Sequence, residues 1–271
     1  MPRSPAPIVV ADSITRVDEA AAQGAVVVNA SHGGVYAAYL AAKLGAAAAI
    51  FNDAGVGRER AGIGGLDYLQ KLGVPAATVG HTTARIGDGA DMLARGLISH
   101  ANPLAMTLGV RPGMACGDAA SALTRAELAR SAPPPAIEGA FLLIPEPAQV
   151  WALDSASLVA PEHYDSIVVT GSHGGLLGGR PETALKDDVR AAFYNDAGIG
   201  IDEAGVSRLP ALDRRGIAAA TVAAESARIG DARSSYDDGV LSRVNARAGA
   251  LGLAPGMTAR EAVLLLCRVL S

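Results

Sequence analysis

The stretch VVVNASHGG at residues 26–34 has a close copy, IVVTGSHGG, at residues 167–175. In both copies a short β-branched run, typical of a buried parallel strand, leads into Ser-His-Gly-Gly. This repetition decides the fold, because further matched stretches follow, each 143 residues apart. They are FNDAG at 51–55 with YNDAG at 194–198, and ARIGD at 84–88 with ARIGD at 227–231.

We interpret the chain as a tandem duplication, since matched stretches extend through most of its 271 residues. The first α/β half covers residues 1–135 and the second covers residues 136–271. A Pro-rich linker, SAPPPAIEG, is expected at about 131–139. We expect strands at 26–29, 47–51 and 76–79, and at 167–170, 191–194 and 219–222.

Helical patterns fill the gaps between these strands, for example at 61–72 and 204–215. Alternation of this kind predicts a mostly parallel sheet with crossover helices. Each half is therefore expected to be a three-layer, Rossmann-like unit, and the two halves to be related by a pseudo-twofold axis. TARE at 258–261 predicts a capping box that begins a last helix. FLLIPEP at 141–147 indicates an extra strand that the sequence assigns to neither half.

The composition excludes some classes of function. The net charge is −4 and no cluster of Lys and Arg is present, so nucleic acid is not expected as a partner. No apolar run is long enough for a signal peptide or a membrane span, which favours a cytoplasmic protein without a membrane partner. Cys116 and Cys267 lie in apolar stretches away from the motifs, so neither is expected to be a nucleophile.

The repeated motifs follow predicted strands and should gather at the carboxyl edge of each sheet, where open α/β sheets bind ligands. The SHGG glycines permit positive φ and leave N–H groups for an anion or a carbonyl oxygen. A strand-to-helix turn that needs glycine for its backbone alone is the alternative. An aspartate beside a histidine can orient the imidazole and raise its basicity. We therefore expect Asp53 and Asp196 to orient His32 and His173.

The arginine of ARIGD has two interpretations. Its planar guanidinium suits a bidentate clamp on a carboxylate or phosphate, whereas a local salt bridge to the aspartate three residues later is the alternative. The asparagine of NDAG favours an Asx-turn or a contact with substrate. The substrate-binding candidates are Gly33, Gly34, Asn52, Thr83 and Arg85, with Gly174, Gly175, Asn195, Ser226 and Arg228. Asn102 and Asn245 are expected to pack or to cap helices.

The two halves differ in their acid–base groups. His81 of the first half is replaced by Ala224, and Thr82 by Glu225. A site that joined both halves would be symmetric in its backbone but asymmetric in its titratable groups. The catalytic candidates are Ser31, His32, Asp53 and His81 in the first half, and Ser172, His173, Asp196 and Glu225 in the second.

Several cofactor and nucleophile motifs are absent. The sequence has no nucleophile elbow, no P-loop, no dinucleotide fingerprint after a strand and no HExxH. We therefore expect no cofactor and no metal, although two histidines and two aspartates that converge on a metal stay as an alternative.

These observations predict acid–base chemistry, as a hydrolase, lyase or isomerase, on a small carboxylate- or amide-bearing metabolite in a cleft between the repeats. The expected layout resembles the aspartate/glutamate racemases in architecture, but those enzymes use paired cysteines at strand ends, which this chain lacks. The alternative is a non-catalytic protein that binds a small anion or a phosphate-containing ligand. Two separate sites, or a homo-oligomer whose sites are completed by a second chain, also fit.

Overall fold

The computed structural model describes residues 4–128 and 132–270. These residues form two compact units. Unit 1 takes in residues 4–55, 61–128, 132–136 and 200–202, and unit 2 takes in residues 56–60, 137–199 and 203–270. Residue 131 of the expected linker lies outside the described residues, and residues 132–139 have no regular secondary structure.

The sheet of unit 1 has the strand order β1-β2-β3-β4-β5. The first four strands pair in parallel, and β5 pairs antiparallel with β4, so the sheet is mixed rather than wholly parallel. Its strands are β1 (Ile8–Ala11), β2 (Val26–His32), β3 (Ala48–Asn52), β4 (Ala76–Val79) and β5 (Ile98–Ala101). The three strands expected in this half are therefore confirmed as β2, β3 and β4, and all three are buried over almost their whole length.

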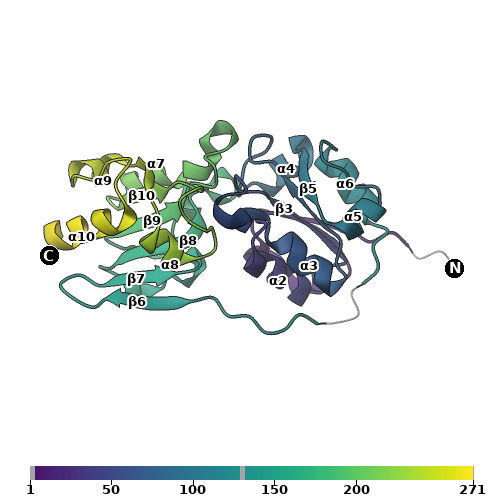
Figure 1. The fold of residues 1–271 in the computed structure, drawn as a ribbon, viewed down its shortest axis with the longest axis horizontal. Coiled ribbons are helices and arrows are strands. Elements are labelled where there is room, and N and C mark those ends of the chain that lie inside the picture. The colour runs from purple at the N-terminus through teal and green to yellow at the C-terminus, as the bar shows by residue number, and fades with distance from the viewer. Residues whose placement is uncertain (1–3, 129–131, 271) are drawn as a thin grey trace. The chain divides into compact units, whose positions relative to one another are not determined.

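Helices cover both faces of this sheet (Figure 1). They are α1 (Glu19–Ala22), α2 (Val35–Lys43), α3 (Gly65–Leu72), α4 (Gly89–Arg95), α5 (Pro103–Thr107) and α6 (Cys116–Leu123). The helices α4, α5 and α6 share a core with Val26, Val28 and Ile50 of the sheet. The helices α2 and α3 pack against each other on the opposite face. Because side chains alternate along a strand, each buried strand supplies both cores.

Unit 2 has a six-stranded sheet with the order β11-β10-β9-β8-β7-β6. The strands are β6 (Ala140–Ile144), β7 (Val150–Leu153), β8 (Ile167–His173), β9 (Ala191–Asn195), β10 (Ala218–Val222) and β11 (Leu241–Val244). The run FLLIPEP supplies β6, which pairs antiparallel with β7 at the sheet edge. The helices are α7 (Arg208–Arg214), α8 (Ala232–Asp237), α9 (Ala246–Ala250) and α10 (Ala259–Val269). The predicted capping box is confirmed, since Thr258 and Glu261 cap α10 reciprocally.

The segment after β8 differs from its counterpart in unit 1. In place of a helix like α2 it has two short 3-10 turns, at Leu177–Gly179 and Pro181–Thr183. Arg208 packs beside this segment, where its Nε donates to the Gly175 carbonyl at 2.9 Å and its guanidinium lies 5.0 Å from the centre of the Tyr194 ring. At the matched position unit 1 has Gly65, where a Cβ would lie 2.6 Å from the Cβ of Ala38. A glycine is therefore needed where two helices pack closely, and an arginine fits where one helix is absent.

The SHGG glycines serve close packing. None of the four has a positive φ, so the expected left-handed conformation is wrong at these positions. A Cβ on Gly33 would lie 2.8 Å from the Gly62 carbonyl oxygen, and one on Gly174 would lie 2.5 Å from the Gly205 carbonyl oxygen. Real Cβ atoms do not approach backbone oxygens so closely, so the residue after each histidine has to be glycine.

This packing predicts that Gly174→Ala lowers the free energy of unfolding by about 1–3 kcal/mol, because the backbone carbonyl of Gly205 cannot move aside cheaply. Gly249→Ala is the matched control, since Gly249 lies in α9 with open space around it. Removing a helical glycine there should stabilise the protein by about 0.5–1 kcal/mol. Urea unfolding of both variants measures the difference, and equal stabilities would contradict the packing argument.

Candidate functional site

The motifs of unit 1 meet at the carboxyl ends of three neighbouring strands. In the sheet register His32 of β2 pairs with Asn52 of β3, and Asn52 pairs with Val79 of β4. The chain leaves β3 toward α3 on one face of the sheet, and leaves β4 toward α4 on the other face. Ligands of open α/β sheets bind where neighbouring connections diverge in this way.

Asp53 and His81 contact each other at this point through their side chains. Asp53 follows β3 and its side chain is 5% exposed, whereas His81 follows β4 and its side chain is 24% exposed. The Asp53 Oδ1 lies 2.8 Å from the His81 Nδ1 and accepts the His81 backbone N–H at 2.9 Å. The buried carboxylate is therefore fixed by two bonds to His81, while part of the imidazole surface is exposed to solvent.

The protonation of this pair follows from its surroundings. Burial raises the pKa of Asp53, but hydrogen bonds and charge from His81, with a further hydrogen bond from Ser99, together lower the pKa below its ordinary value. An ionised Asp53 favours a proton on the His81 Nδ1, so Nε2 carries the lone pair of the neutral ring. This is the arrangement of an oriented general base.

A serine hydroxyl contacts the Asp53 carboxylate, and a threonine hydroxyl contacts that serine. Ser99 on β5 bonds to Asp53, and its Oγ lies 3.0 Å from the Thr78 Oγ1 and 3.2 Å from the His100 Nδ1. Unit 2 repeats the pair as Ser242 and Thr221, whose oxygens are also 3.0 Å apart. Ser99 is not among the residues expected from the sequence, although a serine lies at the matched position, 143 residues later, in the second half.

The matched site of unit 2 has no histidine beside its aspartate. The Asp196 Oδ1 accepts the backbone N–H groups of Ala224 and Gly198, each at 2.9 Å, and Ala224 stands where unit 1 has His81. Burial raises the pKa of Asp196; the nearby charge of Glu225 adds to this, while hydrogen bonds offset it only in part. Two equivalent carboxyl groups thus have pKa values shifted in opposite directions.

His32 and His173 make the same local bond. The Nδ1 of each accepts the backbone N–H two residues later, from Gly34 or Gly175, at 3.1 Å. Burial lowers the pKa of His32 to about 4. Its ring is therefore neutral at pH 7 with the proton on Nε2, which suits a hydrogen-bond donor better than a base. The structure pairs Asp53 with His81 in place of the expected pairing with His32.

Ser31 and Asn52 hold backbone segments together. The Ser31 Oγ accepts the Ile14 N–H at 3.0 Å. The Asn52 Oδ1 accepts the Ala54 N–H at 2.9 Å, which closes an Asx-turn, and its amide donates to the Ala84 carbonyl at 3.4 Å. Ser172 and Asn195 make the corresponding bonds in unit 2.

The hydroxyls near the arginines and the helix asparagines also bond to backbone. Thr83 donates to Gly80 and accepts from Leu97, and Ser226 bonds in the same way in unit 2. The side-chain oxygens of Asn102 and Asn245 each accept the backbone N–H of the residue three positions later, at 2.9 Å, and so cap α5 and α9. The expectation that these asparagines act as caps is confirmed.

Both ARIGD arginines have carboxylate partners. The Arg85 Nε lies 3.0 Å from Asp202, and its Nη1 lies 3.5 Å from Asp88. The Arg228 Nη2 lies 2.9 Å from Asp231, and its Nη1 lies 3.1 Å from Glu59. Each arginine thus forms the local salt bridge within its motif and a second one with a carboxylate outside the motif. Both guanidinium groups are therefore already paired with carboxylates, which does not favour the bidentate binding of a substrate anion.

The loop that carries His81 is supported by a distant segment of the chain. Residues 200–202 belong to unit 1, where the Ile201 N–H donates to the His81 carbonyl at 2.9 Å. Asp202 binds both Arg85 and Arg95, the latter at 2.6 Å. The preceding run Ala197–Gly200 has four consecutive positive φ angles, including 62° at Ile199, which strains a β-branched residue. The matched run 54–57 also has four consecutive positive φ angles, including 62° at Val56.

The chain matches no protein-family model, and neither a curated protein nor a solved structure shows significant similarity to it. Across residues 4–128 and 132–270, no group of three or more His, Cys, Asp or Glu side chains is arranged to hold a metal ion. Within the same residues, no helix has both the length and the apolar character that a membrane crossing needs.

The opposite pKa shifts predict opposite effects of pH on stability. Asp53, with its lowered pKa, stabilises the folded state above its unfolded pKa, and this contribution is lost as the pH falls through the folded value. Asp196, with its raised pKa, opposes folding once the pH rises above its unfolded value. Asp53→Asn should therefore lower the urea midpoint more at pH 7 than at pH 3, and Asp196→Asn less at pH 7 than at pH 3. The same pH trend in both variants would contradict the assignment.

Proposed function

We propose that the chain is an acid–base enzyme in which His81 is the general base, oriented by Asp53. The observation that carries the proposal is the 2.8 Å contact of the His81 Nδ1 with a buried carboxylate, at the point where the connections after β3 and β4 diverge. The substrate is a small carboxylate- or amide-bearing metabolite, and the reaction is a hydrolysis, a lyase reaction or an isomerisation.

In this reaction the His81 Nε2 removes a proton, either from water that attacks an amide or from a carbon next to a carbonyl group. The ionised Asp53 then stabilises the imidazolium, and the proton returns to the product or the leaving group. His32 would donate its Nε2–H to the substrate oxygen that gains negative charge. The N-terminus of α2 lies beside it with no side-chain cap from Gly34, so its N–H groups and dipole favour a carboxylate nearby.

We further propose that the units arose by tandem duplication and that unit 1 retains the catalytic group. Ala224 cannot accept or donate a proton, although the surrounding Asp196, Ser242 and Thr221 repeat those of unit 1. The Asp53–His81 contact favours an enzyme over a simple anion-binding protein, because anion binding does not need an imidazole oriented by a buried carboxylate.

The test is proton NMR of a panel of small amides, hydroxy acids and amino acids in D2O with the purified protein. Deuterium incorporation at carbon, loss of substrate or ammonium release identifies turnover. His81→Gln should lower the rate about 100-fold or more, because a general base contributes about 10²–10⁴-fold. His163→Gln is the matched control, since His163 packs edge-on against Trp151 in unit 2.

Asp53→Asn should lower the rate as well, and the remaining activity should have a different pH profile because the imidazolium loses its counter-ion. Full activity of His81→Gln would show that another group is the base. Failure of the wild type to convert any compound of the panel would show that the proposed substrate class is wrong.

A further inference from the structure

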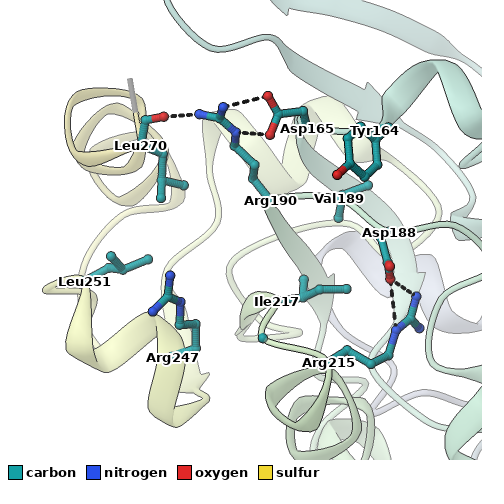
Figure 2. A pocket seen from close by; sticks show the side chains of 11 residues that line it. Tyr164, Asp165, Asp188, Val189, Arg190, Arg215, Ile217, Arg247, Leu251 and Leu270 are labelled. Atoms are coloured by element: carbon teal, nitrogen blue, oxygen red, sulfur yellow. Dashed lines mark hydrogen bonds and ion pairs between the residues drawn. The ribbon is translucent and has the colours of Figure 1, made fainter.

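A pocket of about 290 Å³ lies in unit 2 at the amino ends of its parallel strands, the edge opposite to Asp196. Its walls come from the segments that precede β8, β9 and β10, from α9, and from Leu270 at the end of α10 (Figure 2). This size is near the lower end of ligand pockets, which are about 300–1,000 Å³.

Three guanidinium groups from separate segments line this pocket, those of Arg190, Arg215 and Arg247. Arg190 forms a two-pronged ion pair with Asp165, and Arg215 binds Asp188, its Nε at 3.1 Å (Figure 2). In the described part of the chain no side chain pairs with the exposed guanidinium of Arg247. The lining therefore has one positive charge in excess of its carboxylates.

The remaining walls are largely apolar. Val189, Ile217, Leu251 and Leu270 contribute aliphatic side chains around the charged groups (Figure 2). The pocket therefore combines charged groups with aliphatic side chains, and a ligand with a charged group and an apolar part could contact both.

Unit 1 has no charged residues at the positions that match these charges. The residues at the matched positions of unit 1 are Gly24, Gly45, Ala47, Leu72 and Leu104, where unit 2 has Asp165, Asp188, Arg190, Arg215 and Arg247. Unit 1 forms the same strands without any charged side chain at these positions. It also forms the same bond at the start of the helix after β5, because the Leu104 N–H donates to the Gln70 side chain just as the Arg247 N–H donates to the Asp213 side chain. Arg190 and Arg215 also donate to the backbone carbonyls of Leu270 and Leu185 (Figure 2 shows the first of these bonds). No side-chain bond of this kind from Arg247 occurs within the described residues, so the charge of Arg247 points to a role other than folding.

We propose that this pocket binds a small organic anion that has one negative charge and an apolar body. The Arg247 guanidinium binds the anionic group, and Ile217 and Leu251 contact the apolar body. A carboxylate and a phosphate ester share this chemistry, since both offer oxygens that a guanidinium fork can bind. The site is separate from the Asp53–His81 pair, and the proposal does not depend on the reaction proposed for that pair.

The test is NMR titration of the full chain, labelled at Ile and Leu methyl groups, with benzoate, phenyl phosphate and uncharged benzyl alcohol as probes. At least one of the two anions should bind with a millimolar or lower Kd and shift the methyl signals of Ile217 and Leu251. The anion that binds more tightly identifies the preferred group. Arg247→Leu, which introduces the residue of unit 1, should weaken binding about tenfold or more.

Arg214→Leu is the matched control, because it removes the same charge from the neighbouring end of α7 without changing the pocket lining. Its Kd should equal that of the wild type. The proposal is overturned if neither anion shifts these methyl signals, if both variants weaken binding equally, or if benzyl alcohol binds as tightly as the anions.

Discussion

Two backbone hydrogen bonds at the carboxyl edge of the sheet hold the site of unit 1 together. The Gly33 N–H donates to the Asn52 carbonyl, and the Asp53 N–H donates to the Val79 carbonyl, each at 2.8 Å. They extend the strand pairing by one step beyond the regular strands, so that three loops start from fixed positions. Unit 2 has the same bonds, from Gly174 to Asn195 and from Asp196 to Val222. The positions of the polar side chains follow from this backbone register.

On this shared backbone the two units carry different chemistry. The buried aspartate has a histidine partner in unit 1 and only backbone and hydroxyl donors in unit 2, and the direction of its pKa shift changes accordingly. At the amino edge of the sheet it is unit 2 that has the additional titratable groups, since only unit 2 has a cluster of arginines and aspartates there. A change of a few side chains, with the strands and turns retained, is enough to give similar units different charges at matched positions.

The inner strands could be predicted from the sequence because they are short, β-branched or alanine-rich runs that are buried on both faces. The outer strands β1, β5 and β11 could not, because they are half-exposed and include polar residues such as Ser99 and Arg243. The role of the SHGG glycines was misjudged, since the Gly62 carbonyl that demands Gly33 is distant in sequence. The partner of Asp53 depends on strand register, which motif spacing alone does not give.

The assignment of residues 200–202 to unit 1 has a practical consequence for dissecting the chain. A fragment cut at residue 136 would contain Asp53 and His81, yet it would lack the Ile201 N–H that holds the His81 carbonyl and the Asp202 carboxylate that joins Arg85 to Arg95. The reverse fragment would lack Arg58 and Glu59, whose partners are Ala224 and Arg228. Each unit therefore includes a short segment that lies in the other half of the sequence, residues 200–202 in unit 1 and residues 56–60 in unit 2. Truncation at the Pro-rich segment would remove that segment from each unit.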